Sequence, residues 1–251
     1  MERLEILVRK SLCYTLALIF AATLTAPAAQ SAQKSQSSQN PQSESMDCTD
    51  SDKPITTHDY TSIPGDILQP HRLELTRPFD SNAKLKLHVC RANLRINIEP
   101  DAKQIKLTIV LNSESGSYTV ANYIQTIRIQ PDKGIIQLNF PKAAQASVTV
   151  TMPMGQNSDN EINLGYGDLD FNATGSAGRR EFNVGMGHMQ LLLDKDKSYA
   201  NLKVNVGLGT LHDHRPGGSD GHFTVTKVYP GTGAGALEIN VGMGSLDIRN
   251  D

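Results

Sequence analysis

The sequence predicts an all-β protein, with a single-domain β-solenoid in which short strands stack and turn at Gly-x-Gly corners. Two observations lead to this prediction. From about residue 79 onward, apolar and polar residues alternate in short runs such as Leu94-Arg95-Ile96-Asn97-Ile98, and turn residues separate these runs. A period of two is typical of strands that bury one face, and no segment after residue 30 keeps a helical period. The second observation is a motif that occurs four times in the C-terminal half.

The motif reads apolar-Asn-apolar-Gly-apolar-Gly-x-apolar. Its four copies begin 20, 22 and then 35 residues apart. Repeats at such intervals are typical of solenoids and related arrays. In a stack of this kind the Asn residues of successive copies would lie above one another as a structural side-chain ladder. The recurring positions are Asn163, Gly165, Gly167, Asn183, Gly185, Gly187, Asn205, Gly207, Gly209, Asn240, Gly242 and Gly244.

The spacing of apolar residues within one copy predicts a corner. Ile162, Leu164 and Tyr166 share one parity, so we expect them to point inward together. Leu169 and Phe171 have the opposite parity. A strand cannot change its buried face without a bend or an extra residue, and glycine tolerates the unusual dihedral angles of a corner. We therefore expect the bend at the second glycine, and expect the first glycine to be small so that a neighbouring segment can approach.

The last interval is longer than the others by about the length of His212–His222. We expect this insertion to form a surface loop, because insertions in repeat proteins usually fall in loops on one face. Histidine and carboxylate side chains are also ligands of zinc and similar ions. The candidate metal ligands are His188, His212, Asp213, His214, Asp220 and His222. We nevertheless expect no required metal and no cofactor, because the Arg215–Ser219 stretch between them is typical of a mobile turn.

The N-terminus is typical of an exported protein. Basic residues precede an apolar run, Leu12–Leu24, and small residues follow at Ala26-Pro27-Ala28. This order predicts a secretory signal peptide over residues 1–32, with an uncleaved membrane anchor as the alternative. A Ser/Gln-rich disordered tether and an extended lead-in are expected over residues 33–78, because such a composition buries too little apolar surface to fold. The solenoid would then occupy residues 79–251.

Removing the signal peptide leaves two cysteines, Cys48 and Cys90. An even pair in an exported chain suggests a disulfide, which for a loop of this length would stabilise the fold by about 4 kcal/mol. Two free thiols are the alternative. The cysteines lack the spacing of a zinc site or a C-x-x-C redox motif.

The body resembles the bacterial toastrack domains, a family of adhesin-like, exported β-solenoids of mostly unknown function. The resemblance covers roughly residues 80–250. It depends on the run Leu94–Ile98, the strand Val148–Met152 that ends before Pro153, and the four Gly-x-Gly copies, with the next apolar residue at Leu169, Met189, Leu211 and Leu246. It implies a location in the cell envelope or at the cell surface, and no catalytic residues.

We therefore expect a non-enzymatic exported protein of the periplasm, outer envelope or extracellular space, which binds an unknown envelope or surface component or builds surface. A net charge of -2 without a basic block excludes a strongly basic nucleic-acid binder. The mature chain should have no transmembrane span. One alternative is a glycan-active enzyme that uses Asp168, Asp170 and Asp247, since paired carboxylates hydrolyse glycosides. Another is a metal-binding module that uses the histidine-rich insertion. The sequence does not indicate an oligomeric state.

Overall fold

In the part of the chain that the computed structural model describes, thirteen strands, joined by turns and three short 3-10 helices, form one sheet, which confirms the all-β prediction. The structure describes residues 48, 55, 58–112, 118–173 and 177–250. The expected signal peptide and half of the expected tether and lead-in lie outside the described residues. The strands are β1 (Ile67–Gln69), β2 (Arg72–Pro78), β3 (Lys84–Arg91), β4 (Asn93–Ile98), β5 (Gln104–Leu111), β6 (Ile124–Gln130), β7 (Lys133–Leu138), β8 (Ala146–Met152), β9 (Asp159–Asn172), β10 (Arg179–Leu193), β11 (Asn201–Asp213), β12 (Gly221–Pro230) and β13 (Ala236–Asn250).

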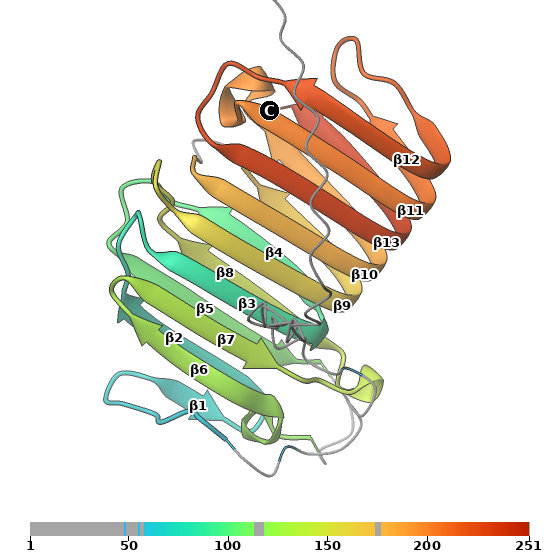
Figure 1. Cartoon of the computed structure of the whole chain (residues 1–251). Coiled ribbons are helices and arrows are strands. Elements are labelled where there is room, and N and C mark those ends of the chain that lie inside the picture. Colours follow the sequence, from blue (N-terminus) through green and yellow to red (C-terminus); the bar gives the residue numbers. More distant parts are fainter. Residues whose placement is uncertain (1–47, 49–54, 56–57, 113–117, 174–176, 251) are drawn as a thin grey trace, which may run out of the picture. The chain divides into compact units, whose positions relative to one another are not determined.

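The four copies of the motif are the four long strands β9, β10, β11 and β13. They run parallel with equivalent residues paired, so that Asn183 pairs with both Asn163 and Asn240. Their order in the sheet is β9-β10-β13-β11, and so the last copy lies between the second and the third (Figure 1). This corrects the expectation that the copies stack in chain order. The reason is β12, which turns back antiparallel along the outer edge of β11 and leaves the inner edge to β13.

Each long strand bends at the second glycine of its motif. Gly167, Gly187, Gly209 and Gly244 have φ of 128°, 149°, 157° and 138°, a region that side chains with a Cβ rarely adopt. Before the bend Ile162 and Leu164 are buried, and after it Leu169 and Phe171 are buried. Each long strand therefore has a first arm before the bend and a second arm after it. Both arms contribute to one hydrophobic core.

Tyr166 does not point inward as its parity suggested. It is 39% exposed, and its counterparts Met186, Leu208 and Met243 are 44–51% exposed. The residue between the two glycines therefore lies on the outside of the bend and points away from the core.

Strands β3 and β4 together form another bent strand, although their sequence does not contain the motif. β3 pairs in parallel with the first arm of β9, and β4 pairs with its second arm. This register places Arg91 beside Tyr166 and hence Cys90 and Ala92 in the two glycine columns. β7 and β8 continue both arms in parallel beyond β3 and β4.

Antiparallel strands complete both ends of the sheet. At one end β5 and β2 follow β8, β1 follows β2, and β6 lies beside β7. Strands therefore begin at Ile67, before the start expected at residue 79, because Leu73 and Leu75 are buried in the same core. At the other end the expected surface loop of residues 212–222 is shorter than predicted, because Gly221 begins strand β12.

Candidate functional site

The repeated spacing of the motif produces a ladder of asparagine side chains on the outer face of the first arm. Asn183 Nδ2 donates to Asn163 Oδ1 at 2.8 Å, and Asn240 Nδ2 donates to Asn183 Oδ1 at 2.8 Å. Asn205 Nδ2 completes the series by donating to Asn240 Oδ1 at 2.7 Å. At the other end Asn163 Nδ2 donates to Glu161 Oε1 at 2.9 Å. Each amide satisfies its neighbour, so the ladder is structural.

The glycines of the motif allow adjacent backbones to approach closely. A Cβ placed on Gly185 would lie 2.6 Å from the carbonyl oxygen of Gly165. At the second position the space is smaller, and a Cβ on Gly187 would lie 1.8 Å from the oxygen of Gly167. Both distances are shorter than any real contact, so side chains are excluded from both columns.

Between the two glycine columns runs a row of exposed apolar side chains, which we call the crest: Tyr166, Met186, Met243 and Leu208. The register pairs these residues strand by strand, from β9 through β10 and β13 to β11. At the β9 end the Arg91 guanidinium carbon lies 4.8 Å from the centre of the Tyr166 ring. Four of the nine large apolar residues that are exposed in the described chain lie in this row. Such a continuous apolar row at the surface is typical of an interaction site.

Phe223 lies at the β12 end of the crest. It pairs with Gly209 where β12 follows the corner of β11, and it is 75% exposed. Its φ is 63°, a left-handed conformation that is costly for a residue with a Cβ. The four long strands use glycine for positive φ at this corner, whereas β12 has a strained and exposed phenylalanine there.

The candidate metal ligands are brought together only in part. His188 Nε2 lies 3.3 Å from Asp247 Oδ2, and His214 Nε2 lies 3.1 Å from Asp247 Oδ1. His212 Nδ1 lies 3.5 Å from Asp220 Oδ2.

The other two candidates do not join these pairs. Asp213 is turned into the molecule toward Arg215, and His222 lies in β12 opposite Thr210. Among the described residues no group of three or more His, Cys, Asp or Glu side chains is arranged to hold a metal ion. The absence of a required metal stays a prediction.

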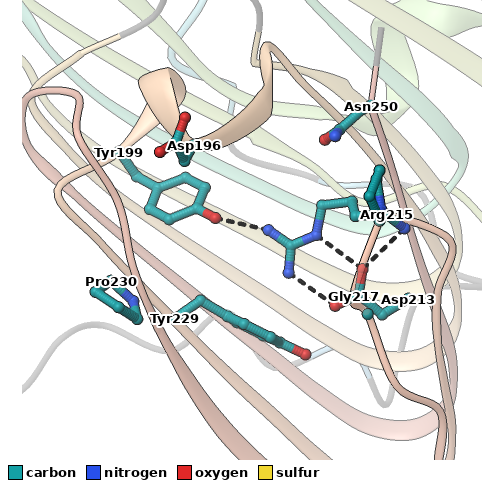
Figure 2. Close-up of a pocket in the computed structure, with 10 residues that line it drawn as sticks. Asp196, Tyr199, Asp213, Arg215, Gly217, Tyr229, Pro230 and Asn250 are labelled. Atoms are coloured by element: carbon teal, nitrogen blue, oxygen red, sulfur yellow. Dashed lines mark hydrogen bonds and ion pairs between the residues drawn. The ribbon is translucent and has the colours of Figure 1, made fainter.

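Asp213 and Arg215 form a buried ion pair at the β12 end of the molecule (Figure 2). Arg215 donates through Nε to Asp213 Oδ1 at 2.7 Å and through Nη2 to Oδ2 at 2.8 Å. Its Nη1 donates to the Tyr199 hydroxyl at 2.6 Å, and its guanidinium stacks on the Tyr229 ring at 4.4 Å. Burial alone would raise the pKa of Asp213, but hydrogen bonds from Arg215 outweigh it and lower that pKa below its ordinary value.

A pocket of about 500 Å³ opens beside this ion pair, lined also by Asp196, Pro230 and Asn250. Burial and the nearby Asp213 carboxylate raise the pKa of Tyr229 to about 12, so its hydroxyl stays protonated at neutral pH. The ion pair and the two tyrosines close the end of the core. The sequence suggested Asp213 as a metal ligand, because no local pattern indicates that Arg215 pairs with it.

Two of the three carboxylates of the glycan-active alternative lie in a second, smaller pocket. This pocket has a volume of about 300 Å³ and is lined by Asp168, Asp170 and Arg95, together with neutral side chains of β4 and β8. Arg95 Nη2 donates to Asp170 Oδ2 at 3.1 Å. Asp247, the third carboxylate, lies two strands farther along and contacts His188 and His214 instead.

Cys48 and Cys90 form a disulfide with their Cα atoms 5.2 Å apart. Cys90 is fully buried in the column of the first glycines. Cys48 Sγ lies 3.2 Å from the point that a Cβ on Gly165 would occupy, so Cys48 covers the outer side of the bend next to the crest.

Comparison with known proteins shows little similarity. No protein-family model and no curated protein matches the sequence. A solved structure described as a "putative cell adhesion protein" from Clostridium sporogenes matches 73% of this chain and 100% of its own, at 14% identity and a TM-score of 0.41. In the described part of the chain no helix is long and apolar enough to cross a membrane.

Proposed function

We propose that the chain is an exported, non-enzymatic β-solenoid of the toastrack type, which acts at the cell envelope or surface by binding. The bent parallel strands and their asparagine ladder support the interpretation of the fold as a solenoid. The observation that carries the binding function is the crest. Burying an apolar side chain is worth roughly 1.5–3 kcal/mol, so a row of four exposed ones is costly unless a partner covers them.

Isolated cell envelopes test this proposal. The processed protein is mixed with envelopes and sedimented, alongside the double variant Met186→Ser/Met243→Ser. Ile67→Ser/Leu68→Ser is the matched control, because it removes two exposed apolar residues from β1 at the opposite end of the sheet. We expect the wild type and the control to sediment with the envelopes and the crest variant to stay in solution. Equal sedimentation of all three, or of none, contradicts the proposal.

A second candidate function is glycan cleavage in the pocket of Asp168 and Asp170. The observation that favours it is the combination of two carboxylates with Arg95 in one depression on the outer face of the strands. Carboxylate pairs act as acid and nucleophile or base in glycosidases. Release of reducing ends from bacterial envelope polysaccharides tests this candidate. Activity that is lost in both Asp168→Asn and Asp170→Asn would establish it over binding alone.

A further inference from the structure

The crest is a narrow convex ridge, and this shape limits what can cover it. Its side chains point outward from the bend, with a glycine column on either side. Adjacent strands lie about 4.8 Å apart, so the four side chains span about 14 Å, and Phe223 extends the row by one strand. A single file of side chains falls well short of the about 800 Å² per partner that a stable protein dimer buries.

A lipid surface needs no complementary groove. Side chains that protrude from a convex edge can enter the headgroup region, where apolar faces are buried about 5–10 Å deep. The composition of the row suits this region. Methionine and leucine form its centre, while Tyr166 and Phe223 stand at its two ends. Tyrosine is favoured at membrane interfaces because its ring is apolar and its hydroxyl can remain in water.

The charge along the crest is compatible with lipid phosphates. In the described chain, the crest and the two glycine columns contain one charged side chain, Arg91, which stacks on Tyr166. Arginine forms strong hydrogen bonds with phosphate groups. The asparagine ladder that follows on the first arm is neutral. On the second arm, Asp168 follows Gly167 directly, and the register pairs it with His188 of β10.

We infer that the crest docks on the surface of a lipid bilayer, with Met186, Met243 and Leu208 entering the interfacial region and Arg91 facing the phosphates. This inference rests on the proposed binding function and names its partner as lipid. It goes further than that function, because the docking requires no protein or glycan in the membrane.

Vesicle sedimentation tests the inference with the processed protein, which lacks the apolar run. One set of vesicles contains phosphatidylcholine alone, and the other contains phosphatidylglycerol as well. We expect the wild type to bind both, and Met186→Ser/Met243→Ser to bind at least about tenfold more weakly, since less apolar surface is inserted. Ile67→Ser/Leu68→Ser should bind like the wild type. Arg91→Gln should weaken binding mainly to the vesicles with phosphatidylglycerol.

The outcomes separate this inference from the proposed function. Binding to whole envelopes but not to either type of vesicle overturns the lipid inference and leaves the binding function intact. Equal vesicle binding by the crest variant and the wild type also overturns it. A dimer in solution that Met186→Ser/Met243→Ser dissociates would identify a second copy, and not lipid, as the occupant. Matching thermal unfolding of the variants and the wild type checks that each variant is folded.

Discussion

The two glycines of each motif are required for different physical reasons. The first, Gly185, has an ordinary backbone conformation but no space for a Cβ. The second, Gly187, has both a φ of 149° and a neighbouring oxygen 1.8 Å from the position of a Cβ. Gly217, in the connection between β11 and β12, has a φ of 77° but open space around it. Steric exclusion and backbone strain can therefore be measured separately in one protein.

We expect Gly185→Ala to lower the free energy of unfolding by about 2–3 kcal/mol, because β9 and β10 must move apart. Gly217→Ala should cost only about 1 kcal/mol, the strain of a Cβ at positive φ. Urea unfolding of both variants measures the difference. If Gly185→Ala is as stable as the wild type, the glycine column is not a packing requirement.

Phe223 offers the opposite case, a residue whose replacement should help the fold. Glycine adopts a φ of 63° without strain but loses more chain entropy on folding. The balance predicts that Phe223→Gly raises the free energy of unfolding by up to about 1 kcal/mol. Phe223→Ala keeps the strain and should bring no gain. A clear loss of stability in Phe223→Gly would mean that the exposed ring stabilises the fold.

At the scale of the strand, burial of the first arm decides stability. Val241 is 2% exposed and pairs in register with Val184 and Val206. Val241→Asp would bury an unpaired carboxylate, which we expect to cost several kcal/mol and to unfold much of the protein. Val228→Asp is the control, since Val228 is 60% exposed on β12. Thermal unfolding by circular dichroism compares them, and similar midpoints would contradict the assigned inward face.

The connection that leads into β1 is held to β2 by Asp66. Hydrogen bonds from Arg77, from the Ile63 backbone and from the Tyr60 hydroxyl lower the pKa of Asp66 to about 2. The unfolded chain has the ordinary value of about 4, so the folded form gains stability above pH 4. That stability is lost as the pH falls from about 4 to about 2.

We expect Asp66→Asn to remove this part of the acid dependence. Acid titration of the free energy of unfolding should show a shallower decline below pH 4 in the variant than in the wild type. Asp101→Asn, at an exposed turn position, should leave the decline unchanged. A variant that loses stability in acid as steeply as the wild type would show that another carboxylate is responsible.

At the scale of the molecule, the β12 end must close a stack that would otherwise expose its core. Strand β12 pairs with the outer edge of β11. The buried Asp213–Arg215 ion pair covers the core at the same end of the sheet. In the solenoid that we propose, a different last repeat is expected, because terminal repeats of solenoids commonly differ from the others. The insertion that the sequence suggested as a surface loop therefore acts as a cap.

We expect Asp213→Ala to destabilise the protein by about 3–5 kcal/mol, because it leaves Arg215 buried without its carboxylate. Asp220→Ala lies seven residues away in the same insertion and should have little effect, since Asp220 is exposed. Chemical unfolding of the two variants makes the comparison. Equal stability of Asp213→Ala and the wild type would show that the ion pair does not contribute to the cap.

Much of the architecture follows from patterns of a few residues. The alternation of apolar residues predicts the strands, and the parity change around Gly167 predicts the bend. The asparagine spacing predicts the ladder, and the cysteine count predicts the disulfide. The strands, the bend and the ladder depend on local geometry, because side-chain direction in a strand is set by position along the chain. The disulfide depends only on the even number of cysteines in an exported chain.

Other features depend on contacts between distant segments, and only the tertiary structure decided them. The place of β13 between β10 and β11 depends on which edge β12 occupies, and no local pattern encodes that choice. The copy at Cys90-Arg91-Ala92 was hidden because it contains no glycine. The outward direction of Tyr166 and its counterparts follows from the shape of the bend. It places Tyr166, which its parity assigned to the core, in the exposed crest.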